Sequence, residues 1–199
     1  MSKLHLPHIQ IASAAFHIYA AEGPKGMTMR KIAAAVGVRA SALYRHFRNK
    51  DAILDAVADA ADVALAQKLQ APAKQNPKKR RMKPLIGRAL DFAVEQPKLF
   101  RLATSHRPRW SDAATGAKNI LTSEVRQAME KGELAQGDAK GHARSLWAQI
   151  CGLVSIRERG DLPDNRGELR GAWFQTAQAV VAGLAPPLRA ATSRSAAAA

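Results

Sequence analysis

Hydroxyl, basic and aromatic side chains are concentrated in one segment, residues 28–50. Hydroxyl groups, cations and helix N-termini bind phosphates. Arginine can bond guanine in two places, and alanine can pack against the methyl group of thymine. Such residues could therefore hold a DNA backbone and read base edges. On these grounds we predict that seven residues contact DNA: Thr28, Arg30, Arg39, Ala40, Ser41, Ala42 and Arg45.

Two short helices separated by a glycine turn are expected to position these side chains. Thr28 precedes apolar residues at helical spacing and can cap a helix over 28–36. Gly37 stands where a left-handed residue ends a helix, and a second helix is expected over 39–47. A helix-turn-helix of this kind can place its second helix in the DNA major groove. Similar hairpins also occur in inert helical bundles.

The roles inside the predicted site are only partly assigned. Leu43 and Phe47 are expected to lie in the core. Base readout is expected from Arg30, Arg39 or Arg45 and the small residues around them, because they stand at or beside the start of the second helix. Which arginine reads a base and which binds phosphate stays open.

The segment MTMRKIAAAVGVRASALYRHFRNKDAIL, with the chain around it over residues 8–60, resembles the DNA-binding domain of the TetR family of bacterial repressors. The matching residues are Gly23, Thr28, Ile32, Ala33, Gly37, Val38, Leu43, Tyr44, His46, Phe47, Lys50 and Leu54. The resemblance implies that Tyr44, His46 and Lys50 contact the DNA backbone, which brings the predicted DNA-binding site to ten residues. It also implies a homodimer that binds a pseudo-palindromic double-stranded operator and releases it when a small-molecule effector binds.

Composition supports a nucleic-acid partner. The 199 residues include 31 Lys and Arg and 16 Asp and Glu, a net charge of +15 that attracts polyanions. The excess is densest in residues 71–84, with six basic residues, no acidic residue and three prolines. Prolines prevent a continuous helix there, so we expect a basic loop. A solvated loop, an auxiliary contact to DNA phosphates or RNA, and a nuclear-localisation signal are the alternatives.

Abundant alanine, few aromatic residues and helical periodicity predict an all-α fold of about nine helices. A DNA-binding domain is expected over 1–50, an effector-binding and dimerisation domain over 51–184, and a disordered tail over 185–199. After the first helix, which ends near Glu22, and the helix-turn-helix, further helices are expected at 50–69, 84–95, 98–105, 112–131, 138–157 and 166–184. The single cysteine and the lack of a signal peptide or a membrane-length apolar run predict a cytoplasmic protein with no membrane partner.

Two further groups of residues are predicted in the second half of the chain. Apolar residues expected to line an effector pocket are Phe92, Phe100, Leu102, Trp110, Trp147, Ile150, Cys151 and Val154. Residues expected at the dimer interface are Leu153, Leu169, Trp173, Ala177 and Val181. Ordinary core packing is the alternative for both sets. Cys151 replaces a histidine found in similar TetR-like segments, which favours an apolar or thiol-reactive ligand.

No cofactor, metal site or catalytic residue is expected. Cys151 with His142 or His106 would be the sole nucleophile and base pair, but no motif surrounds these positions. The residues around His5, His8 and His17 lack the spacing of a metal site. Two other classes of protein stay open: a constitutive or nucleoid-type DNA binder without an effector, and a Cys151-dependent enzyme.

Overall fold

The computed structural model describes residues 8–70, 82–105 and 116–161, and the isolated positions 168, 171, 175 and 183. These ranges hold eight α-helices and no strand, which confirms the predicted all-α fold. The predicted helix over 166–184, apart from those four positions, and the tail lie outside the described residues, as does the basic loop up to residue 81. No helix in the described ranges is both long and apolar enough to cross a membrane.

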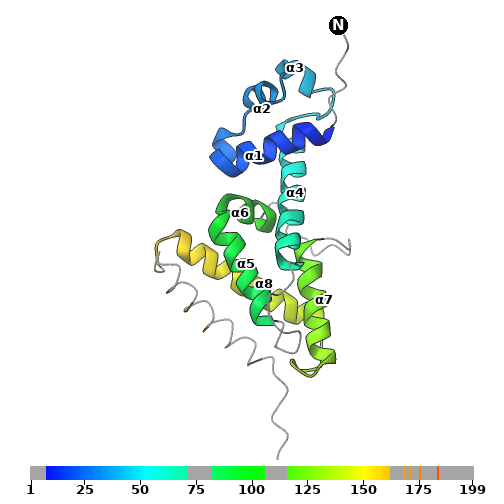
Figure 1. Ribbon diagram of the computed structural model, residues 1–199, viewed down its shortest axis with the longest axis vertical. Helices are drawn as coiled ribbons and strands as arrows, with labels where there is room; N and C mark the ends of the chain where they lie inside the picture. The colour runs from blue at the N-terminus through cyan, green and yellow to red at the C-terminus, as the bar shows by residue number, and fades with distance from the viewer. Residues whose placement is uncertain are drawn as a thin grey trace, which may run out of the picture.

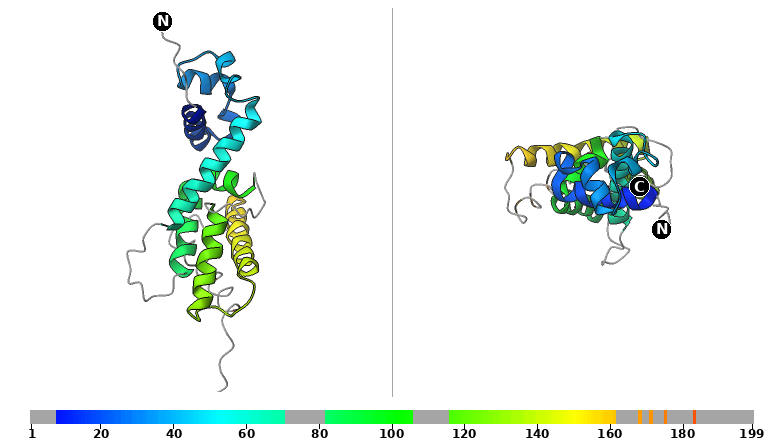
Figure 2. Two further views of the ribbon diagram at one scale, coloured as in Figure 1. Left: turned by 90° about the vertical axis from the view of Figure 1, so that its right-hand side faces the viewer. Right: turned by 90° about the horizontal axis from the view of Figure 1, so that it is seen from above.

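The helices form a small upper unit, a connecting helix and a larger lower unit (Figures 1 and 2). The upper unit, called the head below, contains α1 (His8–Gly26), α2 (Met29–Ala35) and α3 (Ala40–Leu43). The long helix α4 (Lys50–Gln70) runs from the head into the lower unit. The lower unit, called the body, adds four helices: α5 (Met82–Glu95), α6 (Pro97–Ser105), α7 (Ala117–Glu130) and α8 (Ala139–Glu158).

Local capping signals set the start of three helices as the sequence predicts. The Thr28 hydroxyl accepts a hydrogen bond from the Lys31 amide at 3.2 Å and caps α2. The Asn49 side chain accepts from the Ala52 amide at 2.9 Å at the start of α4. Asp138 caps α8 in the same manner, with 3.0 Å to the amide of the second helical residue. These caps confirm the predicted starts.

Three predicted boundaries are wrong. The second helix of the helix-turn-helix is a regular α-helix only over α3, and hydrogen-bonded turns continue it to Phe47. α5 begins at Met82, so the last three residues of the predicted loop 71–84 are helical. α7 begins at Ala117 rather than near 112, because Gly116 has an extended backbone with φ −77° and ψ 157°.

The start of α7 is fixed by a distant carboxylate. Asp62 of α4 accepts a hydrogen bond from the Ala117 amide at 3.2 Å, and Gly116 contributes no side-chain cap. Burial raises the pKa of the Asp62 carboxyl, against the lowering effects of this hydrogen bond and of Lys118. A partner 55 residues away in the sequence therefore supplies the acceptor that a local residue usually supplies.

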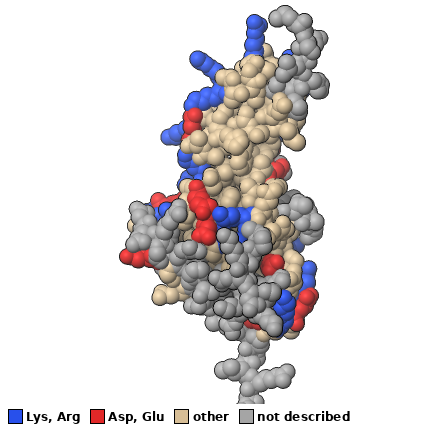
Figure 3. Space-filling view, viewed as in Figure 1, with Lys and Arg blue, Asp and Glu red and all other residues tan. Residues whose placement is uncertain are grey.

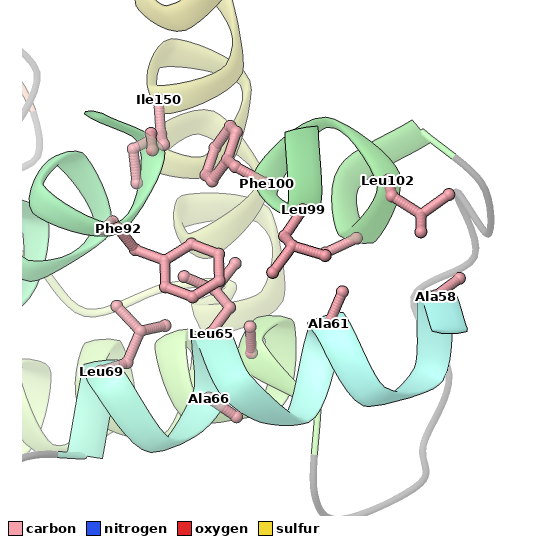
Figure 4. Packing of buried hydrophobic residues seen from close by; sticks show 14 of the residues in the cluster. Ala58, Ala61, Leu65, Ala66, Leu69, Phe92, Leu99, Phe100, Leu102 and Ile150 are labelled. Atoms are coloured by element: carbon pink, nitrogen blue, oxygen red, sulfur yellow. The ribbon is translucent and has the colours of Figure 1, made fainter. Parts of the chain in front are cut away.

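The body is held together where α6 crosses α4. Leu99 and Leu102 of α6 point toward small residues of α4, Ala61 and Ala58 (Figure 4). Alanines let the two helix backbones approach closely, and Leu65 fills the next position along α4 with 0% exposure. The head is thus carried by a helix that is itself fixed in the body core.

Candidate DNA-binding surface

A buried scaffold holds the helix-turn-helix in place. Ile32 of α2 and Leu43 of α3 are fully buried, and Phe47 is 3% exposed. The sequence prediction that Leu43 and Phe47 belong to the core is confirmed. Gly37 has φ +72°, the left-handed region that favours glycine, and it turns the chain sharply between the two helices. This scaffold leaves the polar side chains of α2 and α3 pointing outward.

The predicted DNA-binding residues share one property, which is accessibility. Seven are exposed: Thr28, Arg30, Arg39, Ser41, Tyr44, Arg45 and Lys50. The other three, Ala40, Ala42 and His46, are partly exposed. Tyr44 is 56% exposed. Every predicted contact residue can therefore reach a ligand without unfolding the head.

The head and the helix that carries it have net charges of opposite sign. Residues 8–50 contain seven Lys and Arg and one acidic residue, a net charge of +6. Residues 51–70 contain one lysine and four aspartates, a net charge of −3. Lys and Arg side chains project from the top and the left edge of the head, above and beside α2 and α3 (Figure 3). The exposed basic residues of α2, α3 and the turns beside them are called the basic edge of the head below: Arg30, Lys31, Arg39, Arg45 and Arg48.

The structure adds basic side chains that the sequence prediction omitted. Arg48 follows the turn after α3 and is exposed, and Lys25 is exposed in the last turn of α1. Their charge was visible in the sequence, but nothing local showed that both are exposed on the head. Lys31 pairs with Glu22, the one acid of residues 8–50.

Lys50 has a contact within the protein as well as exposure to solvent. Its ammonium donates a hydrogen bond to the Pro24 carbonyl at 3.5 Å, the outer limit for such a bond. This contact joins the start of α4 to the last turn of α1. A bond this long and exposed leaves Lys50 able to reorient toward an anion.

Thr28 is expected to have two roles, as the N-cap of α2 and as a phosphate contact, and substitutions can distinguish them. Thr28→Ala should lower the free energy of unfolding by about 1 kcal/mol, because an N-cap hydroxyl is lost. Asn49→Ala removes the matched cap of α4 and should cost about the same. Urea denaturation and DNA titration of both variants would test this. Only Thr28→Ala should also weaken DNA binding, and Thr28→Ser should restore it; equal DNA affinities of the two alanine variants would contradict a phosphate contact by Thr28.

The residues predicted to line an effector pocket lie mostly in the hydrophobic core. Phe92, Phe100, Leu102, Trp147, Ile150 and Val154 are between 1% and 7% exposed, and Trp110 lies outside the described residues. Phe100 lies near Ile150, and Phe92 lies above Leu65 of α4 (Figure 4). The core interpretation therefore accounts for these six residues in the structure as it stands.

Cys151 lies at the edge of this core and is partly buried. Burial raises the pKa of its thiol, while the nearby Lys118 ammonium acts in the opposite direction. A thiol with a raised pKa is a poor nucleophile near neutral pH. His142 is nine residues earlier on the same helix, which corresponds to about 13 Å along the axis at 1.5 Å per residue. These two residues do not form a nucleophile and base pair, and His106 lies outside the described residues.

The predicted dimer residues are only partly described. Leu153 of α8 is half-buried, and Leu169, Trp173, Ala177 and Val181 lie outside the described side chains. The face of α8 opposite its buried stripe carries small exposed residues that the sequence prediction omitted: Ser145, Ala148, Gly152 and Ser155. A side chain added at Gly152 would meet no atom within 4 Å.

An all-helical chain whose head presents a basic, exposed helix-turn-helix belongs structurally with DNA-binding proteins. Comparison with known families gives the more particular assignment. Residues 11–57 match the family described as bacterial regulatory proteins, tetR family. Residues 85–184 match the tetracyclin repressor-like C-terminal domain. The chain belongs to the TetR family and is a DNA-binding transcriptional regulator.

Individual relatives are distant. The chain is 27% identical over 133 residues to nucleoid occlusion factor SlmA of Pectobacterium carotovorum, covering 64% of this chain and 67% of that protein. A match to the SlmA of Glaesserella parasuis is 28% identical and covers 63% of this chain and 65% of that one. The chain thus spans about two thirds of these curated relatives.

Solved structures share the fold at low identity. A protein of unknown function from Rhodococcus sp. RHA1 has a TM-score of 0.73, with 21% identity over 92% of this chain and 98% of that one. A TetR variant from Acinetobacter baumannii, solved in complex with minocycline, has a TM-score of 0.64 at 20% identity, covering 89% and 96% of the two chains. The fatty acid degradation regulator FadR of Bacillus halodurans has a TM-score of 0.66 at 19% identity, covering 90% and 97%.

Proposed function

We propose that this protein is a repressor that binds a pseudo-palindromic operator as a homodimer in the cytoplasm and leaves it when a small, largely apolar effector binds. The observation that carries the proposal is the basic edge of the head, where exposed side chains of α2 and α3 surround a buried scaffold. Phosphates would be held by four residues: Thr28, Tyr44, His46 and Lys50. Bases would be read from the start of α3, where helices of this motif enter the major groove.

Dimerisation through α8 is supported by the small residues on its outward face. Ala148 and Gly152 let a second helix approach closely, and a twofold interface uses the same surface on both subunits. Two recognition helices would then contact successive major grooves about 34 Å apart. The domain division expected from the sequence fits this arrangement, with residues 1–50 binding DNA and residues 51–184 binding the effector and the second subunit.

Release by an effector is supported by the way the head is mounted. α4 carries the head and also packs against α5, α6 and α7. A ligand held among α5 to α8 and favouring one position of α4 would change the separation of the two heads, and affinity for the operator would fall without loss of any base contact. The minocycline complex of the similar Acinetobacter protein supports a small-molecule ligand for a body of this fold. We propose no cofactor, metal or catalytic activity.

Binding selection with random duplex DNA would test the proposed function. The wild-type protein should enrich one pseudo-palindrome, and Arg39→Ala should relax discrimination at one position of each half-site. A lost bidentate arginine contact corresponds to about 1–3 kcal/mol of discrimination against the wrong base. Fluorescence anisotropy with matched and mismatched duplexes would measure this. Lys50→Ala, which removes a phosphate contact, should instead weaken all duplexes equally; failure of the wild type to enrich any sequence would refute an operator-specific repressor.

A second candidate function is a nucleoid-type DNA binder that acts at many chromosomal sites without an effector. Two observations favour it: the curated relatives are nucleoid occlusion factors, and the net charge is +15. A protein of this kind should show a steep salt dependence and a small ratio of specific to non-specific affinity. Titration of selected and unrelated duplexes at several salt concentrations would decide between the two candidates.

A further inference from the structure

α1 is interrupted at Gly23, and the carbonyl groups of the turn before this residue lose the regular helical donors. Gly23 interrupts the helix with φ 77° and ψ −166°, and Pro24 follows it. Proline has no amide hydrogen, so the last turn of helix before it is one donor short. The carboxyl end of a helix also carries a partial negative charge that attracts cations. The turn of α1 before Gly23 is therefore suited to bind a positively charged donor.

Lys98 of α6 supplies that donor, although it is 77 residues away in the sequence. Its ammonium donates a hydrogen bond to the Ala21 carbonyl. Its side chain passes beside Gly23, where the Lys98 Cδ atom would lie 3.5 Å from an added Cβ. The contact joins the head to the body at a point separate from α4.

The rest of α6 is fixed within the body. Leu99, Phe100, Leu102 and Ala103 are between 1% and 7% exposed and pack into the core. One helical turn after Lys98, the Arg101 guanidinium donates to the Glu158 carboxylate at 2.7 Å. Glu158 is the last residue of α8. α6 therefore connects the turn of α1 before Gly23, in the head, with the end of α8 in the body.

Two points of attachment restrain the orientation of the head more than one point does. α4 alone would allow the head to bend or rotate about the segment that joins it to the body. A second contact at Ala21 fixes the direction in which the head points. We propose that Lys98 is a positioning residue that, through the Ala21 carbonyl, sets the orientation of the head relative to α8 and hence the operator spacing that the dimer accepts. This inference rests on the proposed dimeric repressor.

The test measures how strongly each variant prefers one distance between the two operator half-sites, in addition to its affinity. An operator selected with the wild-type protein is made with its two half-sites at the selected spacing and with one or two base pairs added. Each added base pair rotates one half-site by about 34–36° and displaces it by about 3.4 Å. Anisotropy titrations are run with wild type, Lys98→Met, Lys98→Arg and the control Lys131→Met, which removes a charge from an exposed residue of the body.

The wild type and Lys131→Met should lose at least about tenfold in affinity per added base pair, as expected for a rigid pair of heads. Lys98→Met should show a difference of about threefold or less between spacings, since mobile heads adapt to either, and a lower affinity at the best spacing. Lys98→Arg keeps a cationic donor and should restore the preference. An unchanged spacing ratio in Lys98→Met would overturn the proposal.

A second measurement needs no DNA and separates this proposal from the proposed function. Amide hydrogen exchange of the free protein should be faster in residues 18–31 of Lys98→Met than in wild type or Lys131→Met, with little change in thermal stability. Equal exchange in all three proteins would also overturn the positioning role. If the wild-type protein has no spacing preference, the proposed repressor fails, and the exchange result alone decides whether Lys98 holds the head.

Discussion

Tyr44→Ala is expected to weaken binding to every DNA duplex by about ten- to a hundredfold, since a hydrogen bond to a charged group contributes about 1.5–3 kcal/mol. The phenol lies on the basic edge of the head and is 56% exposed, so its ring contributes little to the core. The free energy of unfolding should change by less than about 0.5 kcal/mol, as for other surface substitutions. Anisotropy titrations with selected and unrelated duplexes, together with urea denaturation, would measure both effects.

Tyr44→Phe and Val63→Ala are the matched controls for this prediction. Tyr44→Phe removes only the hydroxyl, so it should reproduce most of the loss if the hydroxyl binds phosphate. Val63 is also an exposed apolar residue, at 44%, but it lies on α4 below the basic edge. Val63→Ala should bind DNA as the wild type does. If Tyr44→Ala and Val63→Ala had the same affinity, the phosphate role carried over from the family would be wrong.

The parts of the fold that follow from neighbouring residues were predictable from the sequence. Thr28, Asn49 and Asp138 each accept a hydrogen bond from an amide two or three residues later. Gly37 adopts the left-handed conformation expected after α2. Such signals act over one turn of helix, so a single sequence contains them in full.

The parts that depend on distant residues were not predictable. The start of α7 requires the Asp62 carboxylate, and the turn of α1 before Gly23 receives the Lys98 ammonium. Val63 has the residue type of a core position but lies on the exposed side of α4. Tertiary packing decides these cases, and no local pattern records which face of a helix meets a neighbour.

The candidate DNA-binding surface also has a part that could be predicted from the sequence and a part that could not. Residue types and spacing identified the exposed residues of the head, because alternation between Leu43 or Phe47 and the polar residues around them shows which side is buried. Arg48 and Lys25 were missed because their exposure depends on how three helices pack together. Individual roles of the arginines need the DNA itself, since a guanidinium binds phosphate and guanine through the same donors.

Gly152→Arg is expected to convert the dimer to a monomer and to lower operator affinity by on the order of a hundredfold or more, because the second half-site is no longer bound by a linked head. Gly152 is exposed on the outward face of α8, and an added side chain meets no atom within 4 Å in the single chain. Inside an interface, however, an arginine would separate the two α8 helices and bring two like charges together across the twofold axis. Analytical ultracentrifugation would measure the mass, and anisotropy would measure the affinity.

The fold of the single chain should survive this change, which makes the result easy to interpret. Replacing a glycine inside a helix by arginine gains up to about 1 kcal/mol of helix propensity, so far-ultraviolet circular dichroism should stay unchanged. Ser123→Arg adds the same charge at an exposed position of α7 and should remain dimeric with wild-type affinity. Loss of operator binding in Gly152→Arg with the dimer intact would place Gly152 outside the interface. If Gly152→Arg is monomeric, it should still prefer the same half-site sequence, although it binds that half-site only weakly. Dimerisation raises the affinity and sets the distance between half-sites, but it adds no base contact.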